Sequence, residues 1–229
     1  MTFMKLRFAA CRTRVIAAAA LFALVLALAS ALAGARAGAQ QETRVSLIRD
    51  DATRSVVSNQ LRLAKERGVP VEPLISKALE GVAKHASSSS IRAAMDALQK
   101  RLRKANDLLA PAASVDELSA GADALSVGAP AKTLKLMRKA SPKRSVAVEL
   151  GVLTELIARN VSPKKASQTV LELMARGATS AQLTDLNRSV QSDVALGLTP
   201  EAAIDMRGRG IMSLLPPPPA VSGANGRPR

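Results

Sequence analysis

A short boundary motif recurs along this chain and constrains its fold more than any other feature. In each copy a Gly or Asn is followed by an apolar residue and then by Ser, Thr or Pro. The copies are Gly68-Val69-Pro70, Gly128-Ala129-Pro130, Asn160-Val161-Ser162, Gly177-Ala178-Thr179 and Gly197-Leu198-Thr199. Gly or Asn adopts the left-handed conformation that ends a helix, the apolar residue packs on the last turn, and the third residue begins the next helix. The motif therefore predicts successive helices joined by very short turns.

The apolar residues between these boundaries recur at helical spacing, as at Ile91, Met95, Leu98 and Leu102. Helices are predicted near 44–67, 72–86, 90–109, 115–127, 131–140, 143–159, 163–176, 181–196 and 200–208. Short connections turn each helix back on the one before it. We therefore expect an all-α fold, either an irregular bundle or a short, degenerate solenoid of antiparallel helical hairpins with about eight or nine helices.

Residues 1–39 have the layout of a secretory signal peptide. Basic residues precede an uncharged run from Val15 to Ala33, and Ala-x-Ala triplets follow, the last ending at Ala39. An uncleaved membrane anchor is the alternative, but a run this rich in Ala has little apolar drive. We expect an exported protein, periplasmic or extracellular, with a single helical domain over 40–214 and no transmembrane helix. A Pro-rich disordered tail is expected over 215–229.

Without residues 1–39, the chain is basic and lacks several chemically versatile side chains. It then holds 28 Lys and Arg against 18 Asp and Glu, one His, and no Cys, Trp, Tyr or Phe. This composition excludes disulfides, thiol chemistry, iron–sulfur centres, aromatic stacking, and metal sites that need two His or Cys ligands. We expect no cofactor and no resident metal.

Complete catalytic motifs are missing from the sequence. The single imidazole, His85, precedes a run of serines from Ser87 to Ser90, but a helix end and a helix cap explain both features. Ser162 and Lys165 match a Ser-x-x-Lys pattern that lacks its partner motifs. Three carboxylate pairs remain: Asp116/Glu117, Asp50/Asp51 and Glu149/Glu155. We expect a protein that is not an enzyme, with a carboxylate-based hydrolase of the envelope as the alternative.

Basic residues concentrate between positions 132 and 165. The candidate anion- or partner-binding residues are Lys132, Lys135, Arg138, Lys139, Lys143, Arg144, Lys164 and Lys165. Several of them fall at predicted helix starts, where the helix dipole disfavours cations by ~0.3–1 kcal/mol each. Free amides at a helix start attract phosphates and carboxylates, and nearby lysines strengthen that attraction. The same residues also fit a solvated face that keeps the protein soluble.

These observations favour an exported, non-catalytic helical binding or scaffolding protein. Its anionic partner is expected to be an envelope polymer, lipid head groups or an acidic protein surface. Sequence-specific nucleic-acid recognition is disfavoured, because the chain has no aromatic residues for base stacking beyond position 39. A further alternative is a peripheral membrane-surface binder, since the predicted helix over 90–109 has an apolar side and a basic side.

Overall fold

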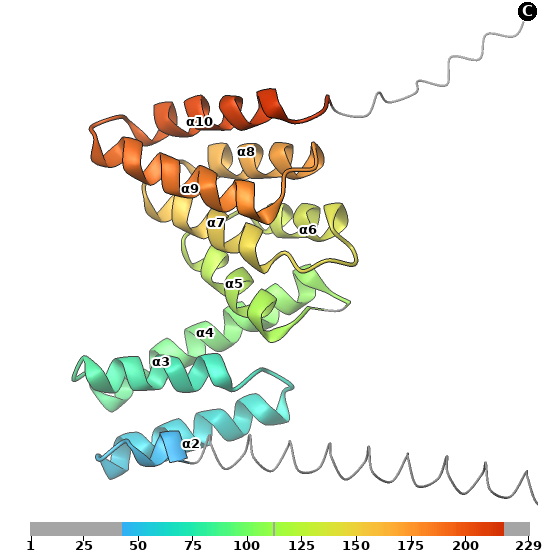
Figure 1. The fold of residues 1–229 in the computed structure, drawn as a ribbon. Coiled ribbons are helices and arrows are strands. Elements are labelled where there is room, and N and C mark those ends of the chain that lie inside the picture. Colours follow the sequence, from blue (N-terminus) through green and yellow to red (C-terminus); the bar gives the residue numbers. More distant parts are fainter. Residues whose placement is uncertain (1–42, 112, 218–229) are drawn as a thin grey trace, which may run out of the picture.

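The computed structural model describes residues 43–111 and 113–217, which fold as helices joined by turns (Figure 1). The helices are α2 (Asp51–Glu66), α3 (Glu72–Ala83), α4 (Ser88–Leu109), α5 (Val115–Ser126), α6 (Ala131–Ala140), α7 (Ala147–Ala158), α8 (Pro163–Ala175), α9 (Ser180–Ala195) and α10 (Pro200–Leu214). A helical turn over 43–46 precedes them. The all-α prediction is confirmed for this part of the chain. The predicted signal segment 1–39 lies outside the described residues.

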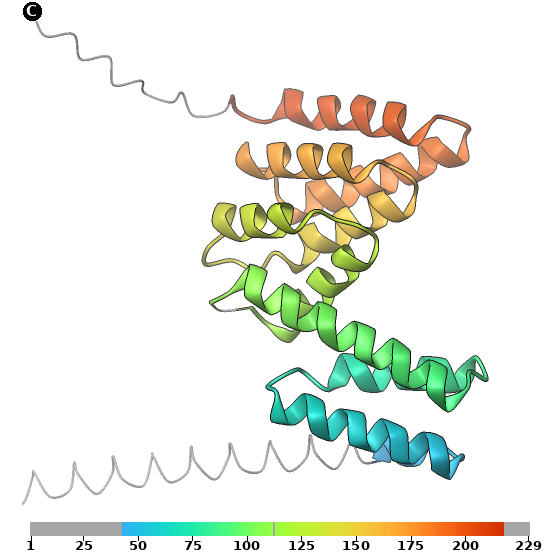
Figure 2. The same ribbon diagram turned by 180° about the vertical axis from the view of Figure 1, so that it is seen from behind.

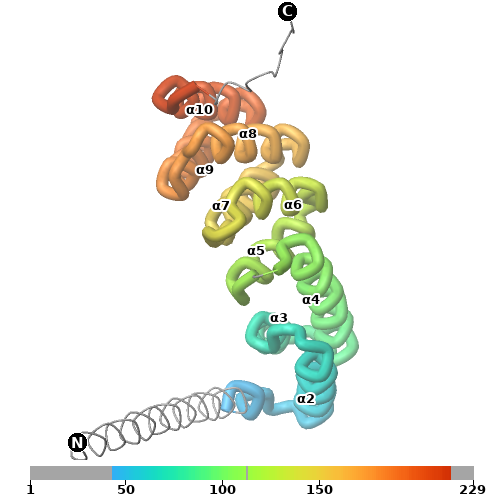
Figure 3. The backbone as a smooth tube through the Cα atoms, turned by 90° about the vertical axis from the view of Figure 1, so that its right-hand side faces the viewer, coloured from blue at the N-terminus to red at the C-terminus, as the bar shows by residue number. Residues whose placement is uncertain are grey.

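The helices stack in two layers along a curved axis (Figures 2 and 3). In one layer, which we call the even layer, α2, α4, α6, α8 and α10 each pack on the next. In the other layer α5 packs on α7, and α7 packs on α9. These odd-numbered helices lie along the inner side of the curve in Figure 3. The even-numbered helices all run in the same direction, so their amino-terminal ends share one edge of the stack (Figure 2).

The second layer is interrupted at α3. This helix packs on α2 and extensively on α4, but it makes little or no contact with α5. α4 is the longest helix of the described chain, at 22 residues, and it carries α3 near one end and α5 near the other. The interruption leaves a crevice between α3 and α5.

Six helix ends close with the same hydrogen-bond pattern, in which an apolar residue beyond the helix donates its N–H to a carbonyl five residues earlier. The donor and acceptor pairs are Val69/Ala64, Ala86/Gly81, Ala129/Ala124, Val161/Leu156, Ala178/Leu173 and Leu198/Asp193, with N···O distances from 2.9 to 3.1 Å. The residue before each donor has a positive φ. Five of these ends confirm the boundary motif, and the sixth places His85 in the left-handed conformation at φ 54°.

Replacement of His85 by Gly is expected to stabilise the protein. A side chain in the left-handed region costs about 1–2 kcal/mol, and the backbone freedom of Gly in the unfolded chain takes back part of that gain. The free energy of unfolding should therefore rise by about 0.5–1 kcal/mol, measured by urea unfolding. The matched control is Gly177→Ala, at φ 83° with open space around a new Cβ, which should destabilise by a similar amount. A loss of stability in His85→Gly would contradict the expectation.

Three predicted helix boundaries are wrong for local reasons. The helix expected over 44–67 is broken before α2, because the Asp50 carboxylate caps that helix by accepting the Thr53 N–H at 2.7 Å. The helix expected over 143–159 starts at Ala147, because the backbone before it binds other partners: the Arg144 carbonyl accepts from Arg138, and the Val146 N–H donates to Glu117. The last helix continues to Leu214 through Gly208, which lets α10 approach α8 closely: a Cβ there would lie 3.0 Å from the Thr169 methyl.

One continuous apolar cluster of Leu, Ile, Val, Met and Ala side chains holds the two layers together. Polar contacts join helices at its margin, as where Arg207 on α10 donates to both carboxylate oxygens of the buried Asp193 on α9 at 2.6 and 2.7 Å. None of the helices over the described ranges combines the length and apolar character needed to cross a membrane.

Candidate functional site

Arg138 belongs to the interior of the protein and not to its basic surface. Its guanidinium forms an ion pair with Glu117, and the two side chains are 11% and 3% exposed. It also donates to the carbonyl oxygens of Leu109, Ser141 and Arg144 at 3.0–3.1 Å. Arg138 therefore joins α4, α6 and the turn that leads to α7. It cannot serve as an exposed anion-binding residue in this arrangement.

The Glu117 carboxylate is satisfied from three directions. It accepts the Ser114 N–H at 2.9 Å in the predicted capping box of α5, the Val146 N–H at 2.9 Å, and the Arg138 guanidinium. Burial raises its pKa, but the hydrogen bonds from Ser114, Val146 and Arg138 outweigh burial, so the pKa lies below its ordinary value. Glu117 is thus an ionised structural anchor.

Two other predicted binding residues are ion-paired at the surface. Lys165 on α8 forms an ion pair with Asp205 on α10. The lysine of the Ser-x-x-Lys pattern is therefore engaged by a carboxylate and is not available as a base for Ser162. Arg144 lies 3.3 Å from the Glu149 carboxylate, whose side chain is completely buried. Because Lys143 and Arg144 lie in the turn before α7, the expectation that they occupy a first helical turn is wrong.

The remaining lysines are exposed and form no ion pair within the described ranges. They are Lys132, Lys135 and Lys139 on α6, Lys143 in the following turn, and Lys164 on α8. α6 and α8 are neighbours in the even layer and run in the same direction, so Lys132 and Lys164, each the second residue of its helix, lie at the same edge. Lys139 lies seven residues after Lys132, roughly 10 Å along α6, and Lys143 follows in the turn at that far end. The predicted set is therefore divided between two edges.

The amino-terminal ends of α6 and α8 differ from those of the other helices from α2 to α10. Each of the other seven helices has a capping side chain, an acidic residue in its first turn, or both. α6 and α8 have neither, and each has a lysine in its first turn instead. Glu201 on α10 accepts the Ser162 N–H at 3.1 Å, just before α8 begins. The two helix starts therefore combine amide N–H groups that no side chain caps with exposed positive charge.

The carboxylate pairs of the hydrolase alternative have other partners. Glu117 is buried against Arg138, Asp50 caps α2, and Glu149 is completely buried. Glu155 accepts a hydrogen bond from Asn187 at 3.0 Å. The crevice between α3 and α5 is lined by Asp116 but not by Glu117, and the crevice beside His85 is lined by Asp50 but not by Asp51.

His85 borders a crevice of about 540 Å³ beside Ser87 and Ser88. Its imidazole forms no hydrogen bond with these serines. Ser87 instead caps α4 by accepting the Ser90 N–H at 3.2 Å. The helix-end interpretation of His85 and the cap interpretation of the serine run therefore fit the geometry.

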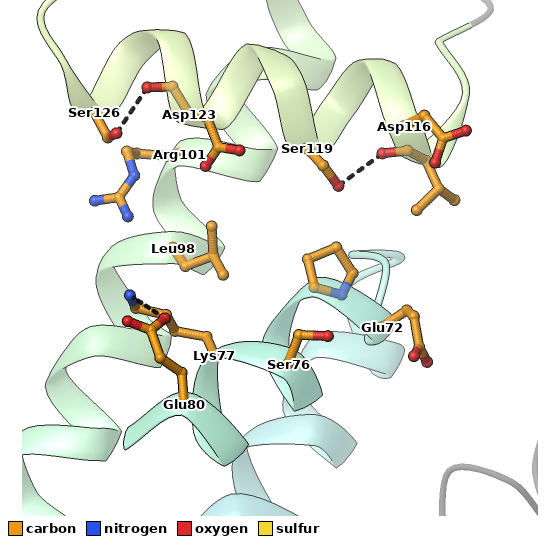
Figure 4. Close-up of a pocket in the computed structure, with 12 residues that line it drawn as sticks. Glu72, Ser76, Lys77, Glu80, Leu98, Arg101, Asp116, Ser119, Asp123 and Ser126 are labelled. Atoms are coloured by element: carbon orange, nitrogen blue, oxygen red, sulfur yellow. Dashed lines mark hydrogen bonds and ion pairs between the residues drawn. The ribbon is translucent and has the colours of Figure 1, made fainter. Parts of the chain in front are cut away.

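The crevice between α3 and α5 has a volume of about 480 Å³ and was not predicted from the sequence (Figure 4). Its floor is formed by Leu98 and Arg101 of α4. Its walls carry four acidic residues, namely Glu72 and Glu80 on α3 and Asp116 and Asp123 on α5. With Lys77 and Arg101 as its basic residues, the crevice has an excess of negative charge in a protein whose formal net charge is +15.

Over residues 43–111 and 113–217, no three His, Asp or Glu side chains gather in a way that could hold a metal ion. No family model, curated protein or solved structure matches this chain. The functional argument therefore depends on the charges and contacts of its own residues.

Proposed function

We propose that this chain is an exported, non-catalytic helical binding or scaffolding protein that contacts an anionic partner through α6 and α8. The observation that carries the proposal is the pair of neighbouring helix starts at Lys132 and Lys164, which have no acidic residue of their own in the first turn and no capping side chain. Amide groups and lysines at such a start attract phosphate or carboxylate groups. The partner is accordingly a surface with closely spaced anions, such as lipid head groups or an anionic envelope polymer.

α6 extends this surface along the even layer. It contains four basic residues and no acidic one, and Lys135 and Lys139 are exposed on it together with Leu136. If stability alone determined the sequence of α6, an acidic residue in the first turn would be favoured, because it would stabilise the helix. We call Lys132, Lys135, Lys139 and Lys164 the basic face.

Co-sedimentation tests the basic face. The protein is mixed with phosphatidylglycerol vesicles and, separately, with isolated anionic wall polymer at about 0.02 M and about 0.5 M salt. Sedimentation is expected at the lower concentration and not at the higher one, because salt screens exposed charges. Lys132→Glu with Lys164→Glu should weaken the apparent affinity about tenfold or more.

The matched control is Lys65→Glu with Arg92→Glu, which changes the net charge equally at exposed positions away from α6 and α8. This variant should sediment nearly as well as the unmodified protein. Equal losses in both variants would show that net charge alone drives the association, and the basic face would then be only a solvated surface.

N-terminal sequencing of the exported protein tests the proposed export, with Gln40 as the expected first residue.

A further inference from the structure

We infer that the crevice between α3 and α5 binds a basic segment of a partner polypeptide, with lysine or arginine side chains on its walls and backbone carbonyls on Arg101. This site is on the opposite layer from the basic face and does not depend on it. The interruption of the second layer creates it, because α3 and α5 both rest on α4 without packing on each other.

The two walls present matching rows of side chains (Figure 4). α3 contributes Glu72, Ser76 and Glu80, and α5 contributes Asp116, Ser119 and Asp123. Their spacing of three or four residues places each row on one face of its helix. Each wall thus offers a carboxylate, a hydroxyl and a second carboxylate, and Figure 4 shows the two helices on opposite sides of the crevice, with the Glu72 carboxylate turned away from α5.

The carboxylates of the α3 wall already have basic partners. Glu72 pairs with Arg44, and Glu80 accepts from Lys77 at 2.8 Å and from Lys84 at 2.5 Å. These lysines hold the pKa of Glu80 at about 2, so it stays ionised. The α3 wall therefore adds little unpaired charge.

The α5 wall is different, because Asp116 and Asp123 form no hydrogen bond or ion pair through their carboxylates in the described chain. Desolvation beside the crevice raises the pKa of Asp123 above its ordinary value of 3.8, against the pull of Arg101 and Lys77. A cationic group placed between Asp116 and Asp123 would add a direct ion pair that neither carboxylate forms in the described chain. The two acids are seven residues apart, or roughly 10 Å along the helix.

Arg101 supplies the other half of the argument. Its guanidinium lies near Asp123 and Ser126 in Figure 4, yet it forms no hydrogen bond within the described ranges. Its Nε atom is buried and has no partner. The terminal nitrogens of Arg101 also have no hydrogen-bond partner in the described chain, and they are the donors that an oxygen atom of a ligand in the crevice could meet.

A polypeptide satisfies both requirements at once. Its backbone carbonyls are acceptors for Arg101, and basic side chains are partners for Asp116 and Asp123. A small polyamine would supply cations but no acceptor. An acidic ligand would meet the four carboxylates of the walls. A basic peptide is therefore the ligand class that matches the crevice.

The test uses fluorescence anisotropy with a labelled Lys-Ala-Ala-Lys peptide, whose extended length of roughly 10 Å matches the separation of Asp116 and Asp123. A labelled Glu-Ala-Ala-Glu peptide is the charge control. The basic peptide should bind, although the protein as a whole is basic, and the acidic one should not. Asp116→Asn with Asp123→Asn, and separately Arg101→Met, should each weaken binding about tenfold or more.

The control variant is Asp107→Asn, an exposed acid on α4 outside the crevice, and it should bind like the unmodified protein. An equal loss in that variant, or no binding of the basic peptide, would overturn the inference. Competition by spermine as strong as that of the unlabelled peptide would show a general cation site instead. If the protein self-associates and the crevice variants abolish that association, the occupant of the crevice is a second copy of this chain. That result would also overturn the inference.

Discussion

Arg138→Met should lower the free energy of unfolding by about 3–5 kcal/mol, because it leaves the Glu117 carboxylate buried without its charged partner. The guanidinium also satisfies three backbone carbonyls at the junction of α4, α6 and α7, and all three lose a donor in the variant. Urea unfolding followed by far-ultraviolet circular dichroism measures the effect. Lys139→Met is the matched control on the same helix, since Lys139 is exposed and unpaired, and it should change stability by no more than about 0.5 kcal/mol.

A double variant separates the ion pair from the packing of Arg138. Glu117→Leu with Arg138→Met removes both charges, so it should be less destabilised than the sum of the two single variants. Similar losses of unfolding free energy in Arg138→Met and Lys139→Met would show that the buried ion pair does not stabilise the protein more than an exposed lysine does.

The same ion pair makes stability depend on pH in a defined direction. Because the folded protein holds the pKa of Glu117 below its ordinary value of 4.5, the stabilisation is complete above that pH. It is lost as pH falls through the lowered pKa of the folded state. The difference in unfolding free energy between the unmodified protein and Arg138→Met should therefore narrow in acid.

Local patterns predicted the helices because each boundary depends on residues close in sequence. Gly68, Gly128, Asn160, Gly177 and Gly197 all take the predicted left-handed conformation. The capping box of Ser114 and Glu117 at the start of α5 depends in the same way on residues close in sequence. His85 lies outside the pattern because the motif is defined by Gly or Asn, although His also adopts a positive φ more often than most residue types.

Contacts between distant residues account for what the sequence did not predict. Glu117 and Arg138 are 21 residues apart, and nothing in either local pattern indicates that they meet. The sequence predicts Asp116 only as one member of a carboxylate pair with Glu117, and no local pattern distinguishes Arg101 from the other basic residues. Their common crevice depends on how α3 and α5 are placed along α4, which is a property of the tertiary packing.

The basic residues also show that a sequence pattern does not predict which side chains share a surface. Charge and spacing identified eight candidate cations, but only the fold distinguishes Lys132, which is exposed, from Arg138, which is inside. Lys143 follows the carboxyl-terminal end of α6, so it lies at the opposite edge from Lys164. A pattern of charges therefore identified the helices of interest and not the residues that share a surface.

Leu153→Ala should destabilise the protein by about 2.7–5 kcal/mol, the range for a buried leucine that leaves a cavity. Its side chain is completely buried on α7, which packs on α5, α8 and α9 and is apolar on several sides for that reason. For a domain of this size the melting temperature should fall by roughly 5–20 °C. Val148→Ala on the same helix is the control: Val148 is 46% exposed, so its truncation should cost no more than about 0.5 kcal/mol. Equal effects of the two substitutions in thermal unfolding would contradict the central position of α7.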